Sequence, residues 1–286
     1  MKEKCVMKYM VVGANGQLGQ ELVHLLNERN AIYVAFDSKS LDITDRDLVF
    51  KTLESERPDV LLDAAAYTAV DAAEDEGKDL NWRVNAEGTK NLADAAKTFN
   101  AKLIYVSTDY VFDGGKVGPY LETDDTNPQN EYGKAKLAGE KYVIESGAFS
   151  YIVRTSWVFG EYGKNFVFTM QTLGQKLSEL SVVDDQHGRP TWTRSLAEFM
   201  LYLVTTSADK GIYNFSNDGD TTWFGFAEEI LKGSDVELIP VSSENFKTKA
   251  QRPNNSVLSL EKAKSTGFEI ISWQEALRLF KERKIQ

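Results

Sequence analysis

The chain has 286 residues, enough to bury a sizeable core in one large domain or two smaller ones. Its 42% hydrophobic and 27% charged residues are ordinary for a soluble globular protein. The net charge of −10 argues against nucleic acid or an anionic membrane as a partner, because either would favour a basic face. The net charge does not exclude a small anionic ligand, since a helix N-terminus with a few basic side chains can bind one.

The polar leader, residues 1–8, contains the only cysteine, Cys5, so no intrachain disulfide can form and a reducing compartment is expected. It lacks the apolar core of a signal peptide. No apolar run approaches the roughly 18 residues that a membrane span needs. These features predict a cytoplasmic protein.

The first apolar run, residues 9–12, is a candidate strand that leads straight into a glycine-rich turn. Leucines then recur at helical spacing, so the glycines stand between a strand and a helix. There Gly13 would permit the tight turn, Gly16 would let the backbone approach a pyrophosphate, and Gly19 would allow close helix packing. The spacing is G-x-x-G-x-x-G rather than the common G-x-G-x-x-G, and a turn without a ligand is the alternative. The turn predicts a dinucleotide site formed by Gly13, Asn15, Gly16, Gln17, Leu18 and Gly19.

The second candidate strand, residues 32–36, ends in an acid, Asp37. An acid at this point can accept hydrogen bonds from the adenosine ribose and would repel the 2′-phosphate of NADP. Ser38 and Lys39 follow directly and could accommodate that phosphate, so NADH and NADPH both stay open, with NADH favoured. A turn-capping acid is the alternative role. Asp42 and Ile43 are candidate contacts on the adenine side.

Strands and helices then alternate, which is typical of a Rossmann-type doubly wound parallel sheet with helices on both faces. Residues 58–63, 102–106 and 150–154 are the next candidate strands, and a long helix is expected from 80 to 99. The third strand opens into small residues against which a cofactor could lie, namely Ala64, Ala65 and Ala66, followed by Tyr67. Ligands bind at strand ends in such sheets, so Thr108, Asp109, Tyr110 and Trp157 are candidate site residues.

Residues 113–131 are predicted to form a loop before a helix that carries Tyr132 and Lys136. Their spacing of four residues puts both side chains on one face of a helix. An ammonium next to a phenol stabilises the phenolate and lowers the pKa of the phenol, so the pair is a candidate proton-transfer unit. Taken alone, the pair is also typical of an amphipathic surface helix.

Three of these features together resemble the extended short-chain dehydrogenase/reductase family: the glycine turn, the Ser107-Thr108-Asp109 strand end and Tyr132-x-x-x-Lys136. A narrower similarity, to the reductases of dTDP-L-rhamnose synthesis, is carried by six segments: 64–71, 107–112, 132–140, 154–158, 185–191 and 252–258. One departure is Asp63, where the family usually has Asn. We expect that exchange to alter a structural hydrogen bond and to leave the chemistry untouched.

The resemblance implies that NADPH or NADH reduces the C4 ketone of dTDP-4-dehydro-L-rhamnose, a step that leads to rhamnose in cell-surface polysaccharide. Tyr132 would donate the proton, with its pKa drawn toward neutrality by Lys136. Lys136 would also bind the nicotinamide ribose. Thr108 would be the second donor to the carbonyl oxygen. The implied catalytic residues are therefore Thr108, Tyr132 and Lys136, the last two also touching the cofactor.

The implied substrate is a small nucleotide sugar, contacted by Thr108, Asp109, Tyr110, Trp157 and Arg252. Trp157 would be a stacking wall, with core packing as the alternative. Arg252 would meet the diphosphate through its planar fork, with a surface ion pair as the alternative. Some family members hold a divalent metal at a dimer contact. This sequence shows no acidic cluster for one, and it leaves a homodimer open.

Rival interpretations share the fold. A 4,6-dehydratase commonly has Glu after the Thr-Asp pair, where this chain has Tyr110. Another nucleotide-sugar 4-reductase, a 4-epimerase, and a non-catalytic NAD(P)-binding regulatory subunit stay open as alternatives. We expect a dinucleotide-binding domain at residues 1–158, with some later helices packing back onto it. Residues 159–286 would form a smaller α/β nucleotide-sugar domain.

Overall fold

Six parallel strands form the central sheet in the computed structural model, which describes residues 7–283. Cys5 lies outside the described residues. The spatial order is β2-β1-β3-β4-β5-β10, and every neighbouring pair is parallel. Their bounds are β1 (Lys8–Val12), β2 (Ile32–Phe36), β3 (Val60–Asp63), β4 (Lys102–Thr108), β5 (Ser150–Thr155) and β10 (Gly211–Asn214). The predicted doubly wound parallel sheet is confirmed, and its order reverses at β1, where such sheets bind ligands.

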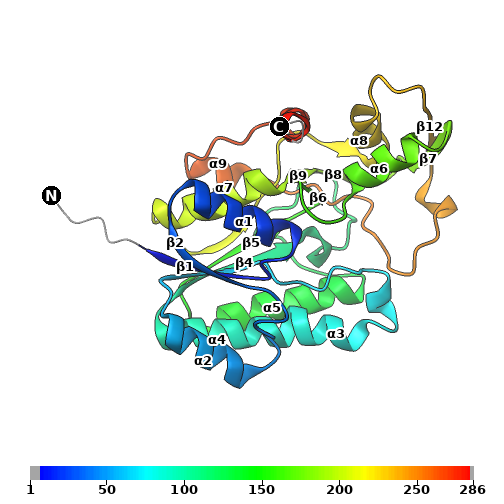
Figure 1. The fold of residues 1–286 in the computed structure, drawn as a ribbon. Coiled ribbons are helices and arrows are strands. Elements are labelled where there is room, and N and C mark those ends of the chain that lie inside the picture. Colours follow the sequence, from blue (N-terminus) through cyan, green and yellow to red (C-terminus); the bar gives the residue numbers. More distant parts are fainter. Residues whose placement is uncertain (1–6, 284–286) are drawn as a thin grey trace.

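Helices cover both faces of the sheet (Figure 1). On one side lie α2 (Arg46–Glu56), α4 (Thr89–Phe99) and α5 (Glu131–Ser146). The other side carries α1 (Gln17–Glu28) and α7 (Thr193–Thr205). Because helices cover both faces, β5 is buried at all of its positions.

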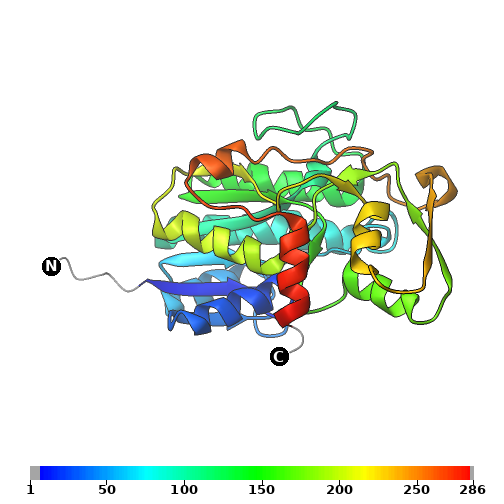
Figure 2. The ribbon, with the colours of Figure 1, turned by 90° about the horizontal axis from the view of Figure 1, so that it is seen from above.

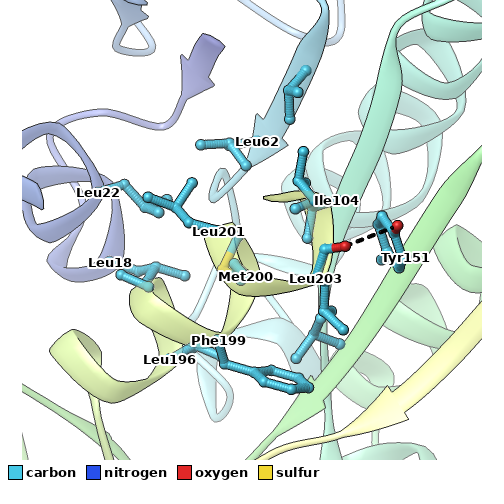
Figure 3. Close-up of a cluster of buried hydrophobic side chains, with 14 of the residues drawn as sticks. Leu18, Leu22, Leu62, Ile104, Tyr151, Leu196, Phe199, Met200, Leu201 and Leu203 are labelled. Atoms are coloured by element: carbon cyan, nitrogen blue, oxygen red, sulfur yellow. Dashed lines mark hydrogen bonds between the residues drawn. The ribbon is translucent and has the colours of Figure 1, made fainter. Parts of the chain in front are cut away.

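Helix α7 belongs to the core of the sheet although it follows residue 158 in the chain. Figure 3 shows Phe199 and Leu201 of α7 together with Leu22 of α1 and Leu62 of β3. The hydroxyl of Tyr151 donates to the Leu203 carbonyl at 3.1 Å. Strand β10 likewise pairs with β5. A division of the chain at residue 158 stays a prediction, with α7 and β10 packed on the first unit.

A smaller unit lies beside the sheet (Figure 1). It contains α6 (Phe166–Gly174), α8 (Trp223–Ile230) and the parallel pair β7 (Glu179–Val183) and β12 (Glu237–Val241). Its apolar core includes Phe159, Phe226 and Phe280. Helix α10 (Trp273–Arg283), red in Figure 2, contributes to this core and reaches back to α1, where Arg283 donates to Glu21 at 3.0 Å.

The remaining elements are short. Strands β6 (Val158–Phe159) and β9 (Thr191–Trp192) pair in parallel, and β8 (His187–Gly188) and β11 (Thr221–Thr222) pair antiparallel. The short helices are η1 (Ala72–Glu74), α3 (Lys78–Trp82), η2 (Arg83–Gly88), η3 (Asp109–Val111), η4 (Ser243–Asn245) and α9 (Glu261–Ser265). Among residues 7–283, no helix combines the length and apolar character that crossing a membrane would take.

The continuous helix predicted from residue 80 to residue 99 is wrong in one respect, because η2 inserts a π-helical turn between α3 and α4. π-turns of this kind are rare and occur frequently at functional sites. Here the turn carries the buried Asn85, whose side chain bonds the backbone of Tyr67. The π-turn is therefore tied to the segment that follows β3.

Replacing Phe199 by Ala tests whether α7 is integral to the core of the sheet. Phe199 is fully buried and stacks on Phe215 with ring centroids 4.4 Å apart. We expect the free energy of unfolding, measured by urea denaturation, to fall by about 3–5 kcal/mol because a large cavity is left. Leu177→Ala, at a 48% exposed position, is the control and should cost far less. Equal effects of the two changes would contradict the packing.

Candidate active site

A cavity of about 260 Å³ opens at the carboxyl ends of β1, β2 and β3. Ten of its lining residues were predicted as cofactor contacts from the sequence: Gly13, Asn15, Gly16, Asp37, Asp42, Ile43, Ala64, Ala65, Ala66 and Tyr67. Ser38, which the sequence offered as a contact for a 2′-phosphate, also lines the cavity, whereas Val12, Leu41 and Val84 were not predicted. Val12 and Leu41 adjoin predicted residues, so the strand-end pattern could have found them. Val84 lies on the unexpected π-turn.

The glycine turn makes the floor of this cavity. Gly13 has a φ of +77°, and a Cβ placed on it would come within 2.6 Å of the backbone of Ala65. Gly16 caps α1, so the first amide groups of that helix stand next to the cavity. A bare backbone and a helix N-terminus suit a pyrophosphate, and the cavity therefore fits a dinucleotide.

Three predicted residues of the turn do not line the cavity. The side chain of Leu18 is buried in the core with α7. Gly19 packs against the Gly13 carbonyl, which leaves no room for a side chain. The Gln17 side chain accepts a hydrogen bond from Asn165 at 3.2 Å, outside the lining. Their roles toward a cofactor stay predictions.

Asp37 is held rigidly at the end of β2. Its Oδ1 accepts hydrogen bonds from the backbone and hydroxyl of Ser40 and from the Lys39 amide, and its Oδ2 accepts from Asn15 at 2.6 Å. The Ser40 hydrogen bonds hold the pKa of Asp37 below its usual range. Asp37 therefore presents a fixed negative charge to the cavity.

The segment after β3 is clamped by Asn85. Its side-chain oxygen accepts from the Tyr67 amide at 3.0 Å and its nitrogen donates to the Tyr67 carbonyl at 2.9 Å. Asn85 is fully buried, so it shapes the cavity wall through Tyr67 without reaching the cavity itself. The sequence indicated the region but not this backbone role.

Helix α5 begins at an Asn cap and lies unusually close to its neighbours. The Asn130 side chain accepts from the Gly133 amide at 2.7 Å, as N-cap residues do. A side chain at Gly133 would overlap the Tyr110 carbonyl. A Cβ at Gly139 would come within 2.6 Å of the Asn85 carbonyl. These two glycines let α5 bring its polar face to the end of β4.

Tyr132 meets Thr108 at that strand end. The Thr108 side chain is near enough to Tyr132 to affect the pKa of its phenol, and the Tyr110 ring lies edge-on to the Tyr132 ring at 5.9 Å. Burial and the Asp109 carboxylate raise the pKa of Tyr132. The expectation that Lys136 lowers this pKa is wrong in this structure, because the Lys136 ammonium lies over another ring. A raised pKa keeps the phenol protonated at neutral pH.

Lys136 is 1% exposed, and its Nζ lies 4.1 Å from the centre of the Tyr105 ring. Burial lowers the pKa of Lys136 to about 8, against the opposing effect of the Asp63 and Glu140 carboxylates. The ammonium is therefore mostly charged at neutral pH but held in an apolar, aromatic setting. A cation over a ring face is stabilised by the ring quadrupole.

Asp63 lies close enough to Lys136 to interact with its charge, although whether it affects the chemistry stays a prediction. It is 1% exposed at the end of β3, and burial raises the pKa of its carboxyl group to about 6. The Lys136 ammonium and the Ala65 amide oppose that rise. Asp63 thus interacts electrostatically with Lys136, which the sequence position alone did not reveal.

Thr108 and Asp109 form a small network beside Tyr132. The Thr108 hydroxyl donates to the Asp109 carboxylate at 3.0 Å and accepts from the Tyr110 amide at 3.2 Å. Burial raises the pKa of Asp109 to about 6, and the nearby hydroxyls of Ser256 and Thr108 oppose that rise. The Asp109 side chain is buried, so in this state it would influence a ligand through its hydrogen bond with Thr108 and not by direct contact.

Trp157 has a backbone φ of +48°, a conformation that non-glycine residues seldom adopt. Its ring stacks on Trp223 with centroids 3.7 Å apart and an angle of 11° between planes. Gly188 permits this position, since a Cβ there would lie 2.5 Å from the indole. Trp157 is half-buried, with Trp223 as a partner that sequence reasoning missed.

Arg252 uses both terminal nitrogens of its fork on Asp71, at 2.9 and 3.2 Å. Asp71 also accepts from the Ala250 amide at 3.1 Å, and Lys249 pairs with Asp75. The segment 249–252 is thereby fastened to the loop after β3. The structure therefore favours the ion-pair alternative for Arg252 in this state. Within residues 7–283, no three His, Cys, Asp or Glu side chains gather as metal ligands.

The family model described as "RmlD substrate binding domain" matches residues 7–284 of the chain. The dTDP-4-dehydrorhamnose reductase of Aggregatibacter actinomycetemcomitans is 40% identical over 95% of this chain and 97% of its own length.

Two solved structures are also similar. The dTDP-4-dehydrorhamnose reductase of Bacillus anthracis in complex with NADP has a TM-score of 0.93 and 41% identity, covering 97% of this chain and 99% of the other. The dTDP-4-dehydrorhamnose reductase of Clostridium acetobutylicum has a TM-score of 0.94 and 41% identity, covering 98% and 100%.

Replacing Asp37 by Ala should move cofactor preference toward NADPH, because the fixed carboxylate that would repel a 2′-phosphate is gone. We expect the ratio of the dissociation constants for NADPH and NADH, measured by fluorescence titration, to fall at least about tenfold. Asp47→Ala removes an acid of α2 that does not line the cavity and is the matched control. An unchanged ratio in Asp37→Ala would show that this side chain does not select the cofactor.

Proposed function

The chain belongs to the RmlD substrate binding domain family, and on that premise we propose that it reduces the C4 ketone of dTDP-4-dehydro-L-rhamnose to dTDP-L-rhamnose with NADPH or NADH. The protein is an NAD(P)H-dependent oxidoreductase. The observation that supports the site assignment best is that α5 packs against the end of β4, with Tyr132 beside the Tyr110 ring that follows Thr108 and with Lys136 buried one turn further along α5.

The reaction adds a hydride to C4 of the sugar and a proton to its oxygen, so one cofactor is oxidised and one proton consumed per alcohol formed. When bound, the nicotinamide supplies the hydride. The cavity lined by Gly13, Gly16 and Asp37 would hold the adenosine and pyrophosphate part. The other predicted cofactor contacts keep their proposed roles, with Lys136 binding the nicotinamide ribose.

Tyr132 would deliver the proton. As the carbonyl oxygen gains negative charge, the phenol O–H bond breaks and a new O–H bond forms on the sugar oxygen. Burial and Asp109 keep the phenol protonated until that moment. The Lys136 charge would then stabilise the phenolate that is left, once the ammonium turns from Tyr105 toward the cofactor ribose.

Thr108 would donate the second hydrogen bond to the carbonyl oxygen. Its hydroxyl is bonded to the Asp109 carboxylate at 3.0 Å, and it would have to rotate toward the substrate. A donor of this kind, aimed at a developing negative charge, typically contributes about 3 kcal/mol to the lowering of the barrier.

The remaining substrate contacts would come from Trp157, Tyr110 and Arg252. Trp157, supported by Trp223, offers an aromatic face for the sugar. Tyr110 lies edge-on to Tyr132 and narrows the space beside it. Arg252 would bind the diphosphate by exchanging its Asp71 partner for phosphate oxygens. The proposal also keeps two expectations from the sequence, a cytoplasmic location and a homodimer.

The direct test incubates the purified protein with dTDP-4-dehydro-L-rhamnose and either NADPH or NADH. We expect one equivalent of cofactor to be oxidised for each equivalent of dTDP-L-rhamnose formed. Interconversion of sugars without net oxidation would indicate a 4-epimerase instead. Cofactor binding without turnover would indicate a non-catalytic module.

Tyr132→Phe removes the proton and leaves the ring in place. We expect the rate of reduction to fall by at least about 100-fold, the contribution of a positioned general acid, while the dissociation constant for the cofactor changes little. Tyr142→Phe, on the same helix α5, is the matched control and should keep full activity. Undiminished turnover by Tyr132→Phe would remove this residue from the proton-donor role.

A further inference from the structure

Asp63 lies on the face of the sheet that α5 covers. Side chains alternate along a strand, so Asp63 shares a face with Leu61, whose side chain packs in the core beneath α4 and α5. On the neighbouring strand β4, Asp63 is directly paired with Tyr105. The Lys136 ammonium lies over the ring of that same Tyr105. Asp63 and the Lys136 ammonium are therefore both neighbours of Tyr105.

Only one of the two carboxylate oxygens of Asp63 accepts a hydrogen bond. Oδ1 accepts from the Ala65 amide at 3.1 Å. Oδ2 is buried and has no hydrogen-bond partner among the described residues. A buried carboxylate oxygen without a partner is costly unless a nearby positive charge compensates it.

The other acid near Lys136, Glu140, already has a basic partner. Glu140 binds Arg154 through both oxygens, at 2.9 and 2.7 Å, and also accepts from the Ser107 hydroxyl at 2.5 Å. Its charge is balanced by that guanidinium in a fully buried pair. Asp63 is thus the acid near Lys136 that lacks a basic partner of its own.

We propose that Asp63 is the counter-ion of Lys136, a positioning residue that keeps the lysine charged for catalysis. The inference rests on the role given to Lys136 in the proposed function. Asp63 does not touch the reacting atoms. It acts through Lys136, which must be charged both to bind the cofactor ribose and to stabilise the phenolate of Tyr132.

The consequence is a change in the alkaline limit of activity. The charged groups that act on Lys136 are Asp63 from β3 and Glu140 from α5, and its ammonium lies over the Tyr105 ring of β4. Around them, Arg154 of β5 neutralises Glu140, Tyr132 of α5 interacts with Tyr105, and Asp109 of η3 interacts with Tyr132. Loss of an anion next to an ammonium lowers the pKa of the ammonium. Without the Asp63 charge, Lys136 would lose its proton at lower pH, and cofactor binding and rate would decline at lower pH.

Asp63→Asn tests this with little change of shape. We expect the alkaline limb of kcat/KM to move to lower pH by about one unit, the lower end of the range for a nearby opposite charge. The pH at which NADPH binding weakens, measured by fluorescence titration without the sugar, should move by the same amount. Asp59→Asn makes the same exchange at an exposed site before β3. In this control, kcat/KM and NADPH binding should decline at the same alkaline pH as in wild type.

The binding titration separates this inference from the proposed function, because it reports the charge of Lys136 even if the sugar is not the substrate. In the Lys136→Met variant, the additional exchange Asp63→Asn should no longer shift the pH at which NADPH binding weakens. The inference would be overturned if kcat/KM and NADPH binding declined at the same alkaline pH in wild type and in an Asp63→Asn variant that retains its melting temperature. It would also be overturned if Asp63→Asn shifted the pH dependence of NADPH binding equally in the Lys136→Met background.

Discussion

The close approach of α5 to the end of the central sheet is the constraint on which the site depends. Gly133 and Gly139 stand where side chains would overlap the backbone of Tyr110 and of Asn85. With both positions bare, the helix can place Tyr132 beside the end of β4 and bury Lys136 against the sheet. Any side chain at either glycine would move the helix outward, and a displacement of about 1 Å already costs catalysis heavily.

Burying a helix with this many charged residues requires that the charges be balanced. Glu140 and Arg154 form a doubly hydrogen-bonded pair with nearly complete burial. Removing one partner of such a pair is costly, because it leaves an uncompensated buried charge. Lys136 and Asp63 are a looser counterpart: both are neighbours of Tyr105, and no hydrogen bond joins them. The tight pair holds the helix, whereas the loose one leaves the lysine free to turn toward a ligand.

The sequence predicted the strands, the glycine turn and the cavity wall well, because these depend on local patterns of apolar and small residues. The π-turn at Asn85 was missed, since local spacing does not show that the Asn85 side chain bonds the backbone of Tyr67, a residue far away in the sequence. The pKa of Tyr132 was predicted in the wrong direction, because the helical spacing of Tyr and Lys says nothing about where the ammonium points. The influence of Asp63 was missed for a related reason: strand pairing, not sequence distance, brings it to Lys136.

The central claim is that the site places a hydride on C4 of the sugar. Reaction of dTDP-4-dehydro-L-rhamnose with a cofactor deuterated at the transferable position of the nicotinamide tests it most directly, with the product followed by nuclear magnetic resonance. The account predicts one deuterium at C4 of the sugar for each cofactor oxidised, and the new hydroxyl proton from solvent through Tyr132. Deuterium at another carbon, or cofactor oxidation without label in the sugar, would contradict it.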